Sequence, residues 1–280
     1  LDAGTGTITF ASTLGAGANA LTLTANGIDF NGGASSVSGS STLTLQPSAN
    51  NVSIGIAGGA GTLDLSTTDI AALANGFSGI TIGYVGGTAT TTINAVTFQD
   101  PVTMQQPAGV GSIVVNGLIT GTGNASVALT SGTGGITFNG VGITTANQNI
   151  DLSGPVTLAT GAVTLDSGSG NITFVGAGST VDGAQALTLN STGATTFGGA
   201  VGGATALTTL TTNAGGTTAI NGGAITTSAA GGQVFNDAVT LGADTTLNAG
   251  AGAINFASTL DGAFSLAANT TGATTFGGAV

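Results

Sequence analysis

Aspartate is the only acidic residue in this chain, and its carboxylates are the side chains best able to do chemistry. There are eleven Asp among 280 residues, with no Glu, Lys, Arg, His or Cys. Acid–base or metal chemistry is therefore limited to what carboxylates do without a basic partner. They bind hard cations such as Ca²⁺, or they act in pairs as the acid and nucleophile of a glycosidase.

A calcium site is the first of these alternatives. Residues 58–64 read GGAGTLD, which is similar to the GGxGxD calcium-binding repeat. The Asp comes one residue late, and no second copy follows. Asp64 and Asp69 are accordingly the candidate calcium ligands, and no other cofactor is expected.

Paired carboxylates are the second alternative. Asp151 and Asp166, or Asp244 and Asp261, are separated by nearly one repeat and could stack. A polysaccharide lyase would need a basic residue as proton acceptor, and the chain has none. We interpret the Asp residues as solvated corners that keep an apolar surface dispersed, and we predict that the chain is not an enzyme.

The charge balance excludes whole classes of partner. The formal net charge is −11 and no side chain carries a positive charge. Nucleic-acid binding requires cations that displace the counterions of phosphate, so neither nucleic acid nor an anionic membrane surface is an expected partner. No run of 18 apolar residues is present, so the chain is not predicted to be a transmembrane segment.

Composition favours a folded chain of β-strands. Hydrophobic residues make up 41% of the chain, charged residues 4%, and the mean hydropathy is +0.48. Disordered Gly- and Ser-rich chains are more polar than this. Thr, Val and Ile are abundant while most strong helix formers are scarce, which favours strands over helices.

An internal repeat organises the sequence. Phe10 and Phe30 are 20 residues apart, and Phe256 and Phe276 are also 20 apart, which indicates a unit of about 20 residues. The phrase GATTFGGAV occurs at 193–201 and again at 272–280, a separation of 79 residues. We interpret this separation as about four units.

Each unit holds three short alternating runs separated by Gly or Asn-Gly corners, as in ALTLTANGIDFNGGASSVSGS at residues 20–40. Alternation at period two puts one face of a strand inward. Runs this short need partners from the next unit. The sequence therefore predicts an all-β fold, a parallel β-helix or β-solenoid with about 20 residues and three short strands per coil, in about fourteen coils.

The periodic apolar residues are predicted to form ladders inside the solenoid. These candidate core residues are Phe10, Phe30, Phe138, Phe174, Phe197, Phe235, Phe256, Phe276, Leu21, Leu23, Leu43, Leu45, Leu63, Leu65, Leu187 and Leu189.

One stretch departs from the repeat. Thr67, Thr68 or Asp69 could cap a short helix over residues 70–74, and Gly76 could end it. The segment QDPVTMQQP at 99–107 holds two of the four prolines and suggests longer loops. We predict a single β-solenoid repeat segment over 1–280, part of a longer chain, with an irregular insertion around 66–112.

A Thr-rich face raises the hypothesis of ice binding. This would need a Thr-x-Thr pair at the same place in every coil. Thr22 and Thr24 are followed by Thr44 and Gln46, and then by Asp64 and Ser66. The row of Thr-x-Thr pairs is therefore not expected to continue from coil to coil.

Several phrases resemble those of the filamentous haemagglutinin-like large exoproteins of bacteria, which include giant β-strand-repeat surface proteins. They are GTITF, ALTLT and GNITF, together with the stretch from TTDIAALANGFSGITIG to GTGGITFNG. The resemblance covers essentially the whole chain. It implies a right-handed β-helical shaft, extracellular or at the bacterial cell surface, acting in adhesion, biofilm formation or cell–cell contact.

Two functions are therefore carried forward. The first is the structural shaft of a large secreted or cell-surface exoprotein, acting in adhesion, cell–cell contact or matrix. The second is a self-assembling extracellular filament or sheath subunit. The expected partners are copies of the chain itself, or a cell-surface or glycan target reached through regions outside this segment.

Overall fold

The computed structural model describes residues 1–228 and 231–280. Its strands form parallel sheets stacked as a β-solenoid of about 12 turns with about 22 residues per coil. In the described residues, a single six-residue helix interrupts the strands. The predicted all-β solenoid fold is confirmed.

The chain divides into two compact units. The first contains Leu1–Ile136 and Thr144–Ala146, and the second contains Thr137–Ile143 and Asn147–Val280. Strands β15 (Gly135–Asn139) and β16 (Ile143–Thr145) lie where the two units divide.

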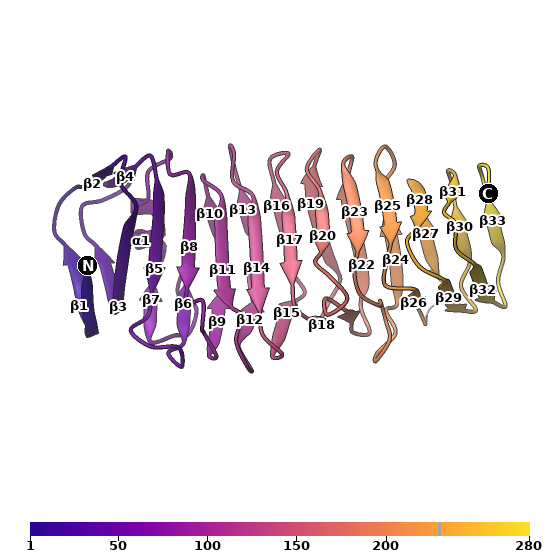
Figure 1. Cartoon of the computed structure of the whole chain (residues 1–280), viewed down its shortest axis with the longest axis horizontal. Helices are drawn as coiled ribbons and strands as arrows, with labels where there is room; N and C mark the ends of the chain where they lie inside the picture. The colour runs from indigo at the N-terminus through magenta and orange to yellow at the C-terminus, as the bar shows by residue number, and fades with distance from the viewer. Residues whose placement is uncertain (229–230) are drawn as a thin grey trace. The chain divides into compact units, whose positions relative to one another are not determined.

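In the first unit, one face is a row of parallel strands, each from a successive coil (Figure 1). In spatial order they are β1 (Asp2–Phe10), β3 (Leu21–Phe30), β5 (Thr42–Gln46), β8 (Gly79–Gly83), β11 (Val102–Gln106) and β14 (Val127–Ser131). A second face contains β7 (Leu63–Leu65), β6 (Ile54–Ile56), β9 (Thr90–Ile93) and β12 (Ser112–Val115). The third face contains β2 (Leu14–Gly17), β4 (Val37–Gly39), β10 (Val96–Phe98) and β13 (Ile119–Gly121).

The second unit repeats this plan. Its first face contains β17 (Ile150–Ser153), β20 (Ile172–Phe174), β23 (Ala194–Phe197), β25 (Thr217–Ile220), β28 (Ala238–Leu241) and β31 (Leu260–Asp261). Another contains β19 (Val163–Gly168), β22 (Ala186–Ser191), β24 (Thr209–Thr212), β27 (Gln233–Phe235), β30 (Ile254–Phe256) and β33 (Thr274–Phe276). The remaining strands are β18 (Val156–Thr160) and β21 (Val181–Asp182) of the seven-stranded sheet, and β26 (Ala224–Thr226), β29 (Thr245–Gly250) and β32 (Leu266–Thr270) of a three-stranded sheet.

Alternation along each strand builds the interior. In β5 the side chains of Leu43 and Leu45 are fully buried while Thr44 between them faces outward. Leu43 is in register with Ile80 of β8, which is in register with Val102 of β11. Apolar residues of successive coils therefore stack on one another, and each coil covers the apolar edge of the one before it.

Side-chain oxygens at the corners hold adjacent coils together. The Asn213 Oδ1 accepts a hydrogen bond from the backbone N–H of Ser191 at 2.7 Å. Asp182 Oδ1 accepts from Ala204 N–H at 2.7 Å, and Asn26 Oδ1 accepts from Ser48 N–H at 3.2 Å. Each pair is separated by 22 residues, which is one coil. The Asn and Asp corners thus satisfy backbone donors that the sheets leave unpaired.

The repeated phrase GATTFGGAV does not mark equivalent places in the coil. Its first copy supplies β23, in the twelve-stranded sheet, and its second supplies β33, in the nine-stranded sheet. At about 22 residues per coil, 79 residues do not make a whole number of turns. The interpretation as four units was therefore wrong, and so was the count of fourteen coils.

The irregular region is shorter than the predicted insertion at 66–112. Strands β8 to β11 fall within it and keep the regular register, with Thr81 opposite Thr103, and with Thr92 of β9 opposite Val114 of β12. Pro101 and Pro107 lie directly outside β11, where no ladder N–H is required of them. Only the stretch around the helix departs from the strand pattern.

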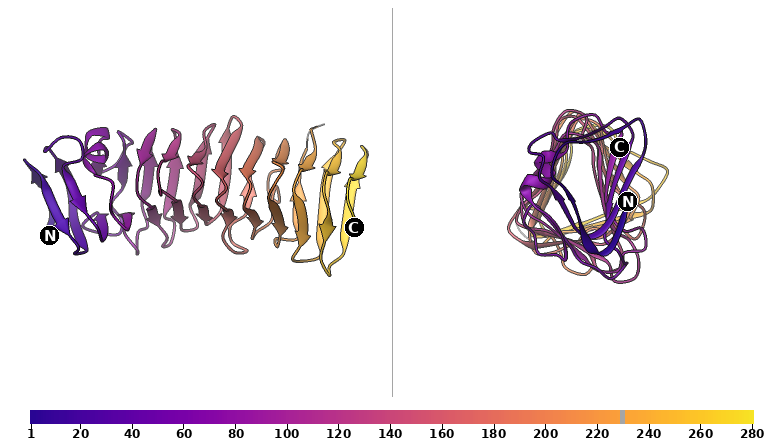
Figure 2. Two further views of the ribbon diagram at one scale, coloured as in Figure 1. Left: turned by 90° about the horizontal axis from the view of Figure 1, so that it is seen from above. Right: turned by 90° about the vertical axis from the view of Figure 1, so that its left-hand side faces the viewer.

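Helix α1 (Thr67–Ala72) begins three residues before the predicted start at residue 70, and its N-cap lies one residue before any predicted cap. Ser66 is the N-cap, and its hydroxyl accepts from the backbone N–H of Asp69 at 3.2 Å. The Asp69 carboxylate in turn accepts from the Ser66 N–H at 2.9 Å, which completes a capping box. The helix lies on the outside of the first unit (Figure 2).

The glycines of the calcium-like phrase serve a close backbone crossing. Strands β6 and β7 pair in parallel, with Ile54 opposite Leu63, although only residues 57–62 connect them. Parallel pairs normally need a connection of about a dozen residues or more. A Cβ atom on Gly55 would lie 2.0 Å from the Gly59 carbonyl oxygen, and one on Gly61 would lie 2.0 Å from the Gly55 nitrogen. Only glycine permits this crossing.

Candidate functional site

The two candidate calcium ligands occupy different environments. Asp64 is in the middle of β7 and its side chain is exposed. Asp69 lies in the first turn of α1 and is buried. One of its carboxylate oxygens accepts from the Phe30 N–H at 2.8 Å and the other accepts from the Ser66 N–H. The Asp69 carboxylate therefore ties the helix to strand β3, and its role as a calcium ligand stays an untested prediction.

Asp100 is a buried carboxylate that the sequence analysis did not single out. It is 1% exposed. Its two oxygens accept from the Gly76 N–H at 3.0 and 3.1 Å and from the Phe77 N–H at 3.1 Å. It thus fixes the return of the chain after α1. Its position directly before a proline and a strand was the available signal, since Asp in such a place often accepts from neighbouring backbone.

The Asp pairs considered for a glycosidase lie on different sheets. Asp151 is on β17 of the twelve-stranded sheet, whereas Asp166 is on β19 of the nine-stranded sheet. Asp244 precedes β29 and Asp261 ends β31, again in separate sheets. Neither pair forms a stack of carboxylates along one face.

Three carboxyl groups of the second unit have shifted pKa values. Burial raises the pKa of Asp151 above its usual value, against a hydrogen bond from Thr173 that lowers it. Burial likewise raises the pKa of Asp237, against hydrogen bonds from Thr218 and Gly216. The backbone and hydroxyl of Ser265 lower the pKa of Asp244.

Most of the predicted core residues are buried, and three are not. Phe10 and Leu21, both in the first two coils, are half-buried. Phe276 is 43% exposed, although we expected it to point into the core. One face of its ring stacks on Phe256 at a centroid distance of 5.3 Å, and β33 is the last strand of its sheet in the part of the chain that the structure describes.

A threonine file on the first unit is longer than expected. Thr22, Thr44, Thr81 and Thr103 are in register on four successive strands. Asp64, which we had placed in this file, belongs to another sheet. The neighbouring file runs Thr24, Gln46, Gly83 and Gln105, so the Thr-x-Thr pair itself does not recur.

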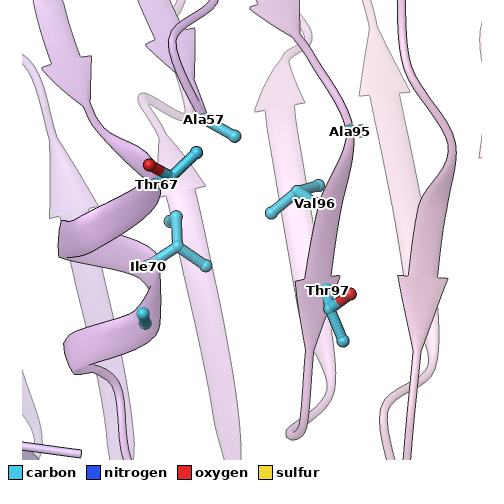
Figure 3. A pocket seen from close by; sticks show the side chains of 7 residues that line it. Ala57, Thr67, Ile70, Ala95, Val96 and Thr97 are labelled. Atoms are coloured by element: carbon cyan, nitrogen blue, oxygen red, sulfur yellow. The ribbon is translucent and has the colours of Figure 1, made fainter. Parts of the chain in front are cut away.

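Two hollows of the first unit flank helix α1. One cavity of about 200 Å³ lies between α1 and β10 and is lined by Ala57, Thr67, Ile70, Ala71, Ala95, Val96 and Thr97 (Figure 3). A second, of about 290 Å³, shares Ile70, Ala71 and Thr97 and extends to Gln99 and Asp100. We call these two hollows together the α1–β10 groove.

The described residues offer few other features on which a site could be built. No group of three or more Asp residues that could hold a metal ion occurs in 1–228 or 231–280. Across the same ranges, no helix has the length and apolar character needed to cross a membrane.

Comparisons of the chain with protein families, with curated proteins and with solved structures found no match.

Proposed function

We propose that the chain is structural, the shaft of a large secreted or cell-surface bacterial exoprotein that acts in adhesion, cell–cell contact or matrix. The observation that carries the proposal is how its polar side chains are used. Corner oxygens such as those of Asn213 and Asp182 accept backbone hydrogen bonds from the adjacent coil. Buried carboxylates such as Asp100 do the same beside the helix.

The stacked coils support this reading as well. A solenoid lengthens by adding coils, each of which contacts only its neighbours, so a shaft of any length can be built from one local plan. The phrases shared with filamentous haemagglutinin-like exoproteins support a place outside the cell. In such a protein the binding target would be met by regions beyond this segment.

In-frame deletion of whole coils from the native gene tests the proposal. Removing the coils that contain β23 to β30 should bring the distal end of the protein closer to the cell surface, by about 4.8 Å per coil. Antibody labelling of that end on intact cells measures the distance. Labelling confined to the cytoplasm, or a distance that does not change, would contradict the shaft.

A filament or sheath subunit is the second candidate. Apolar side chains exposed along the chain, away from its ends, favour it, because a subunit could pair these surfaces with other copies; they include Val85, Val110, Leu118 and Val175. Sedimentation of the purified chain separates the two candidates. Concentration-dependent polymers would favour the filament, whereas a monomer at all concentrations would favour the shaft.

A further inference from the structure

The α1–β10 groove lies beside the free edge of a β-sheet. Strand β10 comes first in the nine-stranded sheet and pairs with β13 on one side only. The Val96 N–H donates to Leu118 O at 3.1 Å, and Phe98 O accepts from Thr122 N–H at 2.9 Å. Because successive residues of a strand direct their backbone groups to opposite edges, the N–H and C=O of Thr97 face α1.

Helix α1 occupies the position where a strand would otherwise pair with β10. Its backbone groups are used within the helix, at its caps and, for the Ala71 carbonyl, by the Ser35 N–H, so it offers β10 no ladder of hydrogen bonds. A helix is also about 10–12 Å wide, whereas strands lie about 4.8 Å apart. The mismatch leaves the two hollows beside α1, and Figure 3 shows Ile70 of the helix and Val96 of β10 on opposite sides of the first of them.

The lining of the groove indicates what it could hold. Near α1 it consists of Ala, Val and Ile side chains and Thr methyl groups, which suit small apolar side chains. Its other end reaches Asp100, a buried carboxylate in a chain with no Lys or Arg. A second copy of the chain would bring another net charge of −11 and no cation. Charge complementarity therefore favours a basic partner over self-association.

We propose that the α1–β10 groove binds an extended, basic polypeptide segment of another protein by strand addition. The segment pairs its backbone with Thr97 at the free edge of β10, places a small apolar side chain between Ile70 and Val96, and directs a Lys or Arg toward Asp100. Main-chain pairing supplies affinity in this mode of recognition, and the side-chain positions supply specificity.

Two pentapeptides test the proposal, acetyl-Lys-Val-Thr-Val-Lys-amide and its counterpart with Glu in place of Lys. Each is titrated into the isotope-labelled 280-residue chain while the Thr97 backbone amide is followed by NMR. We expect the Lys peptide to shift the Thr97 resonance saturably and the Glu peptide to bind at least about tenfold more weakly. An unmoved Thr97 amide, or equal binding of the two peptides, would overturn the proposal.

Substitutions on the exposed face of α1 locate the site. Ala71 lines both hollows and Thr68 lines neither, and both side chains are exposed. Ala71→Phe fills the groove and should weaken the Lys peptide at least about tenfold, whereas Thr68→Phe should leave its affinity within about twofold. Ala71→Arg is the second variant, and it should weaken the Lys peptide more than the Glu peptide, because it adds charge repulsion to the same obstruction. Wild-type affinity in either Ala71 variant would place the peptide elsewhere.

Discussion

At the scale of single residues, the position of an aromatic ring in the stack decides how much it contributes. Phe256 is fully buried, with Phe235 at 5.1 Å on one face and Phe276 at 5.3 Å on the other. Phe276 has the same ring and stacks directly on Phe256 but is 43% exposed. Comparing substitutions at the two residues therefore measures how much a buried ring in the stack contributes to the free energy of unfolding.

We expect Phe256→Ala to lower the free energy of unfolding by about 3–5 kcal/mol, because it removes a buried ring and leaves a cavity. Phe276→Ala should cost less than half as much, since much of its ring already contacts solvent. Urea unfolding followed by circular dichroism measures both. Equal losses for the two variants would contradict the packing described here.

Buried Asp100 should also be sensitive to truncation. Asp100→Ala leaves the Gly76 and Phe77 N–H groups without their acceptor, which should lower the free energy of unfolding by about 1–3 kcal/mol. Asp64→Ala removes an exposed carboxylate and should change it by no more than about 0.5 kcal/mol. Thermal unfolding of both variants at neutral pH provides the comparison, and a larger loss for Asp64→Ala would reverse the assignment.

The raised pKa of Asp151 predicts a specific pH dependence. Burial raises its pKa in the folded state above the unfolded value of 3.8. Between these two pKa values the folded state binds more protons than the unfolded state. The free energy of unfolding therefore falls as the pH rises through that window. Asp151→Asn cannot ionise. The variant should raise the free energy of unfolding at pH 7 by no more than about 1 kcal/mol, with a corresponding rise in Tm. This gain should vanish below pH 3.8.

Relief of general charge repulsion must be separated from this effect. Asp261→Asn removes the same charge from an exposed position of the same sheet. The gain from Asp151→Asn should exceed that from Asp261→Asn at pH 7. Equal gains would mean that the burial of the Asp151 carboxylate does not affect stability at pH 7.

At the scale of elements, glycines permit the close approach of neighbouring coils. A Cβ on Gly142 would lie 1.7 Å from the Thr164 carbonyl oxygen, whereas one on Gly178 would meet nothing within 4 Å. Gly142→Ala should therefore lower the free energy of unfolding by at least about 2 kcal/mol. Gly178→Ala should leave the free energy of unfolding unchanged or raise it by about a few tenths of a kcal/mol, as expected where the backbone accepts alanine without strain. Loss of stability at Gly178 and not at Gly142, in thermal unfolding, would contradict the stacking.

Strands were predictable from the sequence because their alternation is local, but their assignment to faces was not. The Phe residues belong to more than one sheet: Phe174 and Phe197 lie in the twelve-stranded sheet, while Phe235 and Phe256 lie in the nine-stranded one. The two copies of GATTFGGAV likewise supply strands of different sheets, so counting the 79 residues between them as whole coils mixed two faces and shortened the apparent repeat. A local phrase fixes a strand and a corner, whereas the face it occupies depends on loop lengths elsewhere in the coil.

The candidate site was likewise predictable only in part from the sequence. The helix near residue 70 was predictable from its capping residues and its break in alternation. The buried roles of Asp69 and Asp100 were not, because their partners Phe30 and Gly76 are 39 and 24 residues away. The α1–β10 groove arises only when a helix is stacked against a strand, and no pattern within either segment encodes it.

At the scale of the whole molecule, the distribution of charge is the unusual feature. Every charged side chain is negative, so no salt bridge between side chains can form and salt can only screen repulsion. We expect Tm to rise as NaCl increases from about 10 mM to about 150 mM. Differential scanning calorimetry measures the change. A Tm that falls over this range would show that some attractive charge interaction stabilises the fold.

The proposed shaft makes its clearest claim about length. Electron microscopy of the native full-length protein, isolated from its source, tests it most directly. We expect rods one chain thick, whose length increases by about 4.8 Å for every coil of about 22 residues. Fibres or tubes in which several chains lie side by side would contradict the shaft and make the self-assembled solenoid the functional product.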